Sequence, residues 1–245
     1  MSGKRKVLLL TGASRGIGHA TVKRFSDAGW RIITCSRDAV PAECKRDPNW
    51  THHITADLGD PDDLEHFVGE AKRSVDGALH ALVNNAGVSP KAPTKERLGC
   101  LNGDLEDWHK VFQLNFFVPL ILARAFAPAL AHGKGAIVNI TSIAGHVVHP
   151  FAGSAYSTSK AALSALTREM AAEFARLGVR VNAVAPGEIE TAMLSPETAV
   201  LLPRIPLNRL GVPADVAGTI FFLCSDDAAY VTGTEISVNG GQHIY

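Results

Sequence analysis

The chain has 245 residues, 46% of them hydrophobic, which is enough for one large α/β domain with a substantial core. Lysine and arginine together number 24, as do aspartate and glutamate, so the sequence lacks the basic excess of a protein that binds nucleic acid or an anionic membrane surface. Four scattered cysteines without zinc-ligand or disulfide-framework spacing favour reduced thiols, and we expect a single cytoplasmic domain over residues 1–245 with neither nucleic-acid nor membrane partners.

The first half of the chain predicts three β-α units in succession. Short apolar runs indicate strands, and longer stretches with helical periodicity indicate helices. In chain order these are a strand over 7–10, a helix over 17–28, strands over 31–35 and 53–56, a helix over 61–75 and a strand over 81–84. Such alternation is typical of a parallel sheet.

The second half continues the same alternation. We expect a helix over 105–131, a strand over 136–140, a helix over 156–177, a strand over 180–185, a helix over 213–223 and a strand over 235–238. The fold class is therefore α/β, a doubly wound parallel sheet of Rossmann type with helices on both faces. In such folds ligands bind beyond the carboxyl ends of the strands.

A glycine-rich turn follows the first expected strand and leads directly into a helix. Residues 11–18 read Thr-Gly-Ala-Ser-Arg-Gly-Ile-Gly. Glycines at such a place allow a tight turn and let backbone N–H groups approach a pyrophosphate, which the helix N-terminus also favours. The turn predicts a dinucleotide site.

Tyr156 and Lys160 stand four residues apart at the start of an alanine-rich helical stretch, so both side chains lie on one face, one turn apart. A phenol ordinarily loses its proton near pH ~10, and a nearby ammonium favours the phenolate. The pair predicts a tuned acid/base whose phenol pKa is lowered by Lys160.

Histidines give no comparable signal for a metal. His146 and His149 lie three apart without a nearby cysteine or carboxylate, and His52 and His53 are simply adjacent. We expect no metal site.

These motifs resemble, in order and approximate spacing, those of the short-chain dehydrogenase/reductase family. The resemblance rests on residues 11–18, Asn84 to Gly87, Asn115, Ser142, Tyr156, Lys160 and the Pro186-Gly187 pair, and it covers essentially the whole length. Nearest in style are the 3-oxoacyl-carrier-protein reductases, which share the Ser-Arg glycine loop.

The resemblance implies four catalytic residues. Ser142 would hydrogen-bond the substrate oxygen, and Tyr156 would exchange a proton with that oxygen. Lys160 would hold the nicotinamide ribose and act on Tyr156, and Asn115 would retain a water that connects Lys160 with solvent. The cofactor would carry the hydride.

The resemblance also implies the cofactor-binding residues. They follow the ends of successive strands and the start of the catalytic helix: Gly12, Ser14, Arg15, Gly16, Ile17, Gly18, Ser36, Arg37, Asp57, Leu58, Asn85, Ala86, Gly87, Tyr156, Lys160, Pro186, Gly187, Ile189 and Thr191. Alone, the residues around Asn85 also fit a turn, and Asp57 also fits a helix cap.

Cofactor choice depends on the end of the second strand, where NAD enzymes usually carry an acidic residue. Ser36 stands there, followed by Arg37, and Arg15 in the glycine loop is placed to reach the same phosphate. Two guanidinium groups suit a phosphomonoester, so NADP(H) is expected. Asp38 is the residue that, after a small shift of the turn, would favour NAD(H).

The substrate is less defined. Residues 192–209 are expected to form a lid, and His146, Val147, Val148 and Phe151 to line the opposite wall. The role of Glu188 stays open between solvent and a polar substrate. The charges in the 88–104 loop, including Lys91, Lys95 and Arg97, fit an acidic partner or an ordinary solvated loop.

The predicted function is an NADP(H)-dependent oxidoreductase that interconverts a ketone or 3-oxoacyl carbonyl and a secondary alcohol. Two alternatives stay open: an NAD-dependent sugar or polyol dehydrogenase, and a non-catalytic NADP(H) sensor on the same fold. The helices over 105–131 and 156–177 carry apolar residues on more than one face, which predicts a homodimer or homotetramer.

Overall fold

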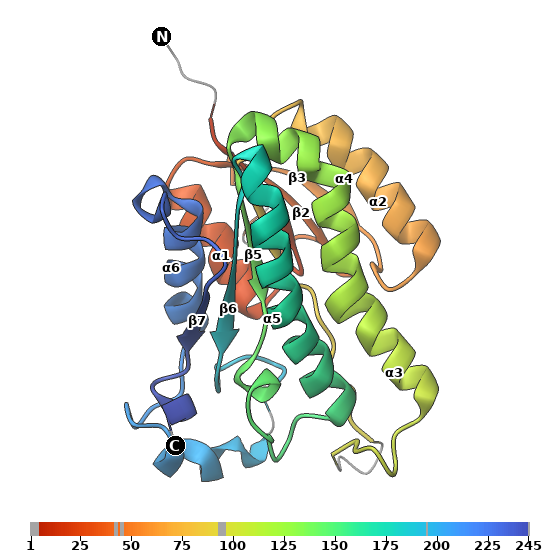
Figure 1. Cartoon of the computed structure of the whole chain (residues 1–245), viewed down its shortest axis with the longest axis vertical. Helices are drawn as coiled ribbons and strands as arrows, with labels where there is room; N and C mark the ends of the chain where they lie inside the picture. Colours follow the sequence, from red (N-terminus) through yellow and green to blue (C-terminus); the bar gives the residue numbers. More distant parts are fainter. Residues whose placement is uncertain (1–4, 42–43, 45–46, 93–96, 195, 245) are drawn as a thin grey trace.

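A computed structural model of the chain describes residues 5–41, 44, 47–92, 97–194 and 196–244. Within these ranges a parallel sheet runs in the order β3-β2-β1-β4-β5-β6-β7, which confirms the predicted doubly wound fold (Figure 1). The strands are β1 Val7–Thr11, β2 Arg31–Ser36, β3 Trp50–Thr55, β4 Ala81–Asn84, β5 Ala136–Ile140, β6 Arg180–Pro186 and β7 Glu235–Val238.

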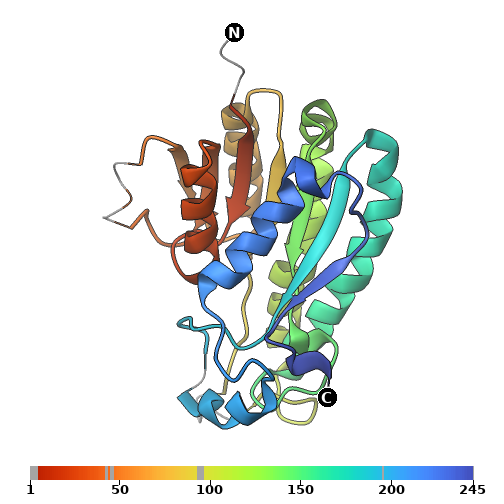
Figure 2. The same ribbon diagram turned by 90° about the vertical axis from the view of Figure 1, so that its left-hand side faces the viewer.

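Helices cover both faces of this sheet. They are α1 Gly16–Asp27, α2 Pro61–Val75, α3 Leu105–Phe112, α4 Val118–Gly133, α5 Ser154–Phe174 and α6 Pro213–Cys224. Apolar side chains of α1 and α6 pack on one face, and those of α2, α4 and α5 pack on the other. The side view of Figure 2 shows α1 in red and α6 in blue apart from α5 in teal, with strands between them.

The strand order changes direction between β1 and β4. Chain connections run from β1 outward to β3 on one side, and from β4 outward to β7 on the other. Helices that lead away to both sides leave a crevice beyond the carboxyl ends of these central strands. The short 3₁₀ helix Pro196–Arg204 lies at this end of the molecule, toward which the strand arrows point in Figure 1.

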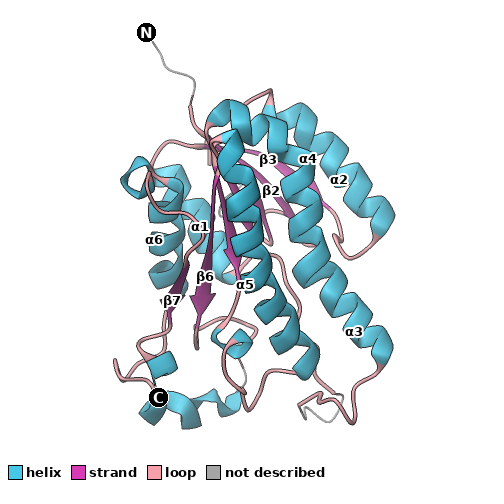
Figure 3. Cartoon of the chain, viewed as in Figure 1, coloured by secondary structure: helices cyan, strands magenta, loops and turns pink. Residues whose placement is uncertain are grey.

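The long helix expected over 105–131 has a break in its regular geometry. A π-helical turn, Gln113–Phe117, separates α3 from α4, although the segment runs as one continuous helix in Figure 3. Val118 N–H donates to the Gln113 carbonyl five residues back, and Pro119 has no N–H to donate to Asn115. The missing donor favours the wider turn, and π turns often mark functional positions.

The segment Leu105–Gly133 is long and apolar enough to cross a membrane by length and composition. Core helices of globular folds meet the same criterion. Here the buried side chains of α4, among them Leu122, Phe126 and Leu130, pack into the core beside α2 and α5. In the most apolar window of this segment 39% is buried, so packing against the sheet accounts for part of the apolar composition.

Other helix and strand ends differ from the predicted ones by a few residues. Strand β3 begins at Trp50 rather than at 53, and α5 begins at Ser154 and continues after Phe174 as a 3₁₀ turn, Ala175–Leu177. The region expected to be a loop lid contains the 3₁₀ helix Pro196–Arg204. Three further 3₁₀ turns, Ile143–Gly145, Asp226–Ala228 and Gln242–Ile244, complete the described elements.

Candidate active site

A cleft of about 300 Å³ lies where the central strands end. Its walls come from the glycine turn after β1, the ends of β2, β4, β5 and β6, and the first turns of α5. Every residue that the sequence assigned to cofactor binding lines this cleft, as do Ser142, Tyr156 and Lys160. The structure therefore brings the predicted binding and catalytic residues together, and their roles stay predictions.

The glycine turn has the shape that a dinucleotide phosphate requires. Helix α1 begins at Gly16, its first turn contains no acidic residue, and no side chain caps the free N–H groups there. A Cβ on Gly18 would lie 2.0 Å from the Gly12 carbonyl oxygen, so no side chain fits at this close approach. The bare helix N-terminus facing the cleft suits a pyrophosphate.

Asn85 supports the glycine turn from the neighbouring strand. Its side-chain amide donates to the carbonyls of Thr11 and Gly12 at 3.0 and 2.9 Å, and its backbone N–H donates to the Thr11 hydroxyl at 3.1 Å. These bonds fix the ends of β1 and β4 relative to each other. Asn85 thus has a structural role within the cleft wall, alongside its predicted binding role.

Opposite charges meet at the end of β2. Arg15 Nη1 lies 3.9 Å from Asp38 Oδ2, and Arg37 Nη1 lies 3.9 Å from Asp57 Oδ2. Both arginine side chains are more than half exposed, while the hydroxyl of Ser36 donates to the Asp38 carbonyl at 2.7 Å. The end of β2 therefore carries both the arginines expected to bind the 2′-phosphate of NADP(H) and Asp38, the carboxylate expected to favour the unphosphorylated ribose of NAD(H).

Tyr156 and Ser142 both line the cleft, near enough for the Ser142 hydroxyl to lower the pKa of the phenol. The Ser142 hydroxyl also accepts from Ala144 N–H at 3.2 Å, so it caps the 3₁₀ turn that follows β5. That turn packs closely on α5, since a Cβ on Gly145 would lie 2.9 Å from the Ala161 nitrogen. The close packing sets the distance between the strand that carries Ser142 and the helix that carries Tyr156.

The predicted pKa shift of Tyr156 has the opposite sign in the structure. Burial raises the pKa of the phenol, the negative charge of Glu188 raises it further, and the hydrogen bond with Ser142 acts against both. The nearness of the Lys160 ammonium was the basis of the predicted shift, and that prediction omitted the loss of hydration of the Tyr156 phenolate on burial. Burial therefore favours the protonated phenol.

Lys160 is buried beside Tyr156. Its Nζ donates to the Ile140 carbonyl at 2.6 Å and lies 5.7 Å from the centre of the Tyr156 ring. Because burial penalises the ammonium, the pKa of Lys160 falls to about 8. The cleft thus holds a lysine whose charge is costly and whose ammonium donates to a backbone oxygen.

Asn115 acts from behind the cleft, within the π-helical turn. Its Oδ1 accepts from Val88 N–H at 2.9 Å, and its Nδ2 donates to the Val88 carbonyl at 3.0 Å and to Ser159 Oγ at 3.1 Å. A Cβ on Gly87 would lie 3.2 Å from Asn115 Oδ1 and 3.4 Å from Lys160 Nζ. Asn115 therefore joins the end of β4 to α5 close to Lys160.

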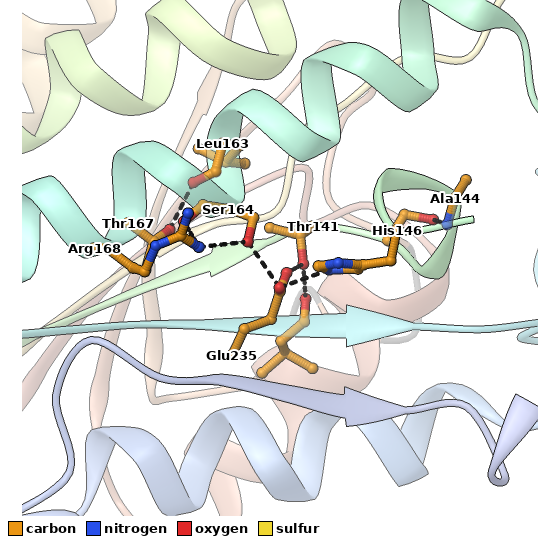
Figure 4. A network of polar contacts seen from close by, with 10 residues as sticks. Thr141, Ala144, His146, Leu163, Ser164, Thr167, Arg168 and Glu235 are labelled. Atoms are coloured by element: carbon orange, nitrogen blue, oxygen red, sulfur yellow. Dashed lines mark hydrogen bonds and ion pairs between the residues drawn. The ribbon is translucent and has the colours of Figure 1, made fainter. Parts of the chain in front are cut away.

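A polar network holds the strand end that carries Ser142 (Figure 4). The neighbouring Thr141 donates its hydroxyl to Glu235 at the start of β7. Ser164 on α5 donates to Oε2 of the same carboxylate at 2.8 Å, and His146 Nε2 lies 2.7 Å from this oxygen. Glu235 thus ties together β5, α5, β7 and the turn after Ser142.

The two histidines after β5 both have carboxylate partners, contrary to the sequence reading. His146 contacts Glu235, and His149 Nε2 lies 2.5 Å from Glu188 Oε1. Both partners are far along the chain and no local pattern reveals them. Among the described residues, no group of three or more histidine, cysteine or acidic side chains is placed to hold a metal.

The expected walls of the substrate region are partly revised. Phe151 lines the cleft, whereas His146 turns to Glu235 and Val148 is 89% exposed. The sequence reading missed His149, which takes their place in the cleft lining. On the lid, the cleft is lined by Ala192, Met193, Leu194 and Thr198.

The 88–104 loop lies next to the start of α5. Arg97 Nε donates to the Ala152 carbonyl at 2.7 Å, and Ser154 N–H donates to the Leu98 carbonyl at 2.8 Å. Arg97 therefore has a structural role. Lys91 lines the cleft, and Lys95 lies outside the described residues.

Comparisons with known proteins agree with this geometry. The family model described as enoyl-(acyl carrier protein) reductase matches residues 12–243. Protein FixR of Bradyrhizobium diazoefficiens is 56% identical, over 99% of this chain and 88% of its own. A 3-oxoacyl-[acyl-carrier-protein] reductase of Synechocystis is 37% identical, over 98% of each chain.

Solved structures extend the likeness to three dimensions. An oxidoreductase of the short chain dehydrogenase/reductase family from Brucella ovis, in complex with a partially ordered NAD, is 50% identical with a TM-score of 0.82, covering 96% of this chain and 100% of that one. ElxO with NADP bound is 28% identical with a TM-score of 0.84, covering 98% and 100%. These neighbours bind one or the other nicotinamide dinucleotide.

Proposed function

The chain belongs to the short-chain dehydrogenase/reductase family of oxidoreductases, and on this premise we propose that it interconverts a carbonyl and a secondary alcohol with NADP(H). Tyr156 is the general acid and base of this reaction. The observation that carries the proposal is the meeting of Ser142, Tyr156 and Lys160 in the same cleft as the bare N-terminus of α1.

Each of these side chains has a task that its environment supports. The bound cofactor supplies or accepts the hydride. Ser142 donates a hydrogen bond to the substrate oxygen, where charge develops, and Tyr156 passes its proton to that oxygen. The raised pKa of the buried phenol keeps the proton on Tyr156 near neutral pH, which favours carbonyl reduction as the direction of proton delivery. Lys160 stands beside Tyr156 to hold the ribose hydroxyls of the cofactor.

NADP(H) is proposed because of the side chains at the end of β2. Ser36 occupies the position usual for an acidic residue, and the guanidinium groups of Arg15 and Arg37 line the cleft with much of their surface free. A 2′-phosphate would replace the long contacts that these arginines make with Asp38 and Asp57. The nearness of Asp38 to Arg15 supports the alternative, NAD(H), since a carboxylate there accepts from ribose hydroxyls and repels a phosphate.

Substrate choice is proposed at the level of a ketone or 3-oxoacyl group. Relatives that are 35–37% identical to this chain include 3-oxoacyl-[acyl-carrier-protein] reductases. The cleft itself combines apolar side chains such as Phe151 and Met193 with the polar pair His149 and Glu188. This mixed lining supports a substrate with a polar group near its carbonyl, including the sugar or polyol class.

The test is oxidation of NADPH and of NADH by the purified protein with a panel of ketones, hydroxy ketones and 3-oxoacyl thioesters. We expect turnover, a higher kcat/KM with NADPH, and a loss of about 10²–10⁴-fold in kcat for Tyr156→Phe with cofactor affinity kept. Arg37→Ala should raise the KM for NADPH far more than that for NADH.

Two outcomes would contradict parts of the proposal. If the protein prefers NADH and Asp38→Asn abolishes this preference, the end of β2 binds the ribose of NAD(H) and not a 2′-phosphate. Tight cofactor binding without turnover of any panel member, unchanged by Tyr156→Phe, would favour a nucleotide sensor.

A further inference from the structure

A buried histidine and carboxylate face each other in the cleft, apart from the catalytic residues. The side chains of His149 and Glu188 are 11% and 7% exposed, and their atoms Nε2 and Oε1 lie 2.5 Å apart. Glu188 follows the Pro186-Gly187 pair at the end of β6, while His149 lies in the loop between Ser142 and α5. Both residues line the cleft.

The backbone around His149 fixes the position of its proton. Nδ1 accepts from the N–H groups of Phe151 and Ala152, both at 3.2 Å. An imidazole nitrogen that accepts carries no hydrogen, so the proton lies on Nε2 and is donated to Glu188 Oε1. His149 in this arrangement is neutral, and the pair carries the single negative charge of the Glu188 carboxylate.

This carboxylate is left with bonding capacity. Among the described residues, Oε1 has His149 as its partner, and no hydrogen bond is made to Oε2. The cations that line the described cleft are Arg15, Arg37, Lys91 and Lys160, and none of them forms an ion pair with Glu188. A buried carboxylate held by one neutral donor is poorly compensated for its lost hydration.

Glu188 also lies within electrostatic reach of the reacting groups. Glu188, Tyr156 and Ser142 line the same cleft, and the charge of Glu188 raises the pKa of the phenol. A ligand that fills this cleft with its oxygen at Tyr156 and Ser142 therefore shares the cleft with the Glu188 carboxylate. The ligand group best suited to this carboxylate is one that donates hydrogen bonds and neutralises a negative charge.

We propose that Glu188, oriented by His149, binds a protonated amine of the substrate, so that the preferred substrates are amino ketones and the corresponding amino alcohols. The proposal rests on the carbonyl reductase function proposed above and specifies its substrate. An ammonium donates to Oε2 and balances the charge, whereas a hydroxyl supplies only the hydrogen bond. A carboxylate or phosphate at this atom is repelled.

The test compares substrates of equal shape. In the oxidative direction the first series is 1-amino-2-propanol, 1,2-propanediol and 2-butanol, which carry an ammonium, a hydroxyl or a methyl group at the same position. The second series has the same three groups beside a phenyl-substituted alcohol: 2-amino-1-phenylethanol, 1-phenyl-1,2-ethanediol and 1-phenyl-1-propanol. The matched ketones serve in the reductive direction. Wild type is compared with Glu188→Gln and with the control Glu190→Gln, which alters an exposed glutamate two residues along the same loop.

We expect the ammonium compound to have a kcat/KM about ten- to hundredfold above its methyl counterpart, the range for a hydrogen bond to a charged group. Glu188→Gln should remove this preference, measured as the ratio of the kcat/KM values of the ammonium and methyl compounds, because the ratio cancels any effect of the lost charge on Tyr156. Glu190→Gln should leave both unchanged. His149→Phe, which removes the positioning donor, should raise KM for the ammonium compound more than it lowers kcat.

A binding measurement separates this proposal from the proposed function. Amino alcohol and reduced cofactor form a complex that cannot react, so calorimetry gives the affinity without turnover. If ketones are reduced with no preference for the ammonium, or with a preference for an anion, the assignment of Glu188 is wrong and the reductase function stands. If no ketone is reduced but the amine binds in a Glu188-dependent way, the site is supported and the reaction is wrong. Absence of both turnover and amine binding overturns the assignment.

Discussion

Two histidine–glutamate pairs flank Ser142 and differ in how completely the carboxylate is bonded. At the sheet edge, Glu235 uses both oxygens, receiving hydrogen bonds from Thr141 and Ser164 and contacting His146. In the cleft, Glu188 Oε1 contacts His149, and Oε2 has no hydrogen bond to any residue that the structure describes. The first pair joins four segments of the fold, and the second lines the cleft, where the proposed substrate would meet it.

The difference shows how a fold separates structural from functional charge. Polar groups that hold elements together are saturated, because an unmade bond in the interior is costly. Those reserved for a ligand are left short of partners and lower the stability of the free protein. Under the proposed function, Lys160, whose hydrogen bond goes to the Ile140 backbone, belongs with Glu188 in the second group.

The largest effect expected from this comparison concerns Lys160. Lys160→Met should lower kcat by about 10²-fold or more, since it removes the cation beside Tyr156. The folded pKa is about 8 against ~10.4 for an unfolded lysine, so the unfolded chain binds more protons between these values. As the pH rises from 7.5 to 9.5, the unfolding free energy of wild type should therefore increase by about 2 kcal/mol relative to that of the variant.

Urea denaturation of both proteins at several pH values measures this gain. The difference between the proteins isolates the lysine, because other titrating groups are common to both. A difference that stays flat over this pH range would mean that Lys160 carries an ordinary pKa.

The next largest effect concerns the saturated pair. Glu235→Leu removes the acceptor of two hydroxyl donors and the partner of His146, so the free energy of unfolding should fall by about 3 kcal/mol. For a chain of this size this corresponds to a Tm lower by roughly 10 °C, measured by calorimetry. A decrease in the unfolding free energy below about 1 kcal/mol would mean that Glu235, like Glu188, contributes little to the stability of the fold.

The two histidines should also differ in how much their substitution lowers the unfolding free energy. His149→Ala leaves the N–H groups of Phe151 and Ala152 and the Glu188 carboxylate without their partner, and we expect a loss of about 2 kcal/mol. The side chain of His146 is 46% exposed, so His146→Ala should cost less than about 1 kcal/mol. Denaturation curves of the two variants, recorded side by side, give the order, and the reverse order would contradict the comparison.

The smallest effect on stability is expected for Glu188→Gln. The amide keeps the shape and the acceptor for His149 while removing the poorly compensated charge, so the unfolding free energy should stay within about 1 kcal/mol of wild type or rise. Glu190→Gln provides the baseline for an exposed glutamate. A marked loss of stability in Glu188→Gln alone would show that this carboxylate supports the fold.

Much of the fold follows from local sequence patterns. Apolar runs such as β1 and β5 are buried on both faces, so continuous hydrophobicity predicts them as parallel strands. Glycine turns and helix starts then place the cleft at the strand ends. The position of Tyr156 and Lys160 on one helical face was equally predictable, because it depends only on a spacing of four residues.

Contacts between distant segments were not predictable. Glu188 meets His149 across 39 residues and Glu235 meets His146 across 89, and neither partner is signalled near the other in the sequence. The sign of the Tyr156 shift was wrong for a similar reason, since burial is set by the whole fold. The π turn had a local signal, Pro119, which the regular helical periodicity obscured.

The end of strand β5 shows how the hydroxyl of Ser142, which we propose to be the reactive one, can be held in place without using the space around it. Thr141 directs its hydroxyl to Glu235 and the Val184 carbonyl, while the next residue, Ser142, presents its hydroxyl to Tyr156. Adjacent residues of an extended chain point to opposite sides, so the anchor and the reactive hydroxyl never compete for room. Under the proposed function, a substrate that contacts Ser142 therefore leaves the bonds of Thr141 to Glu235 and Val184 undisturbed.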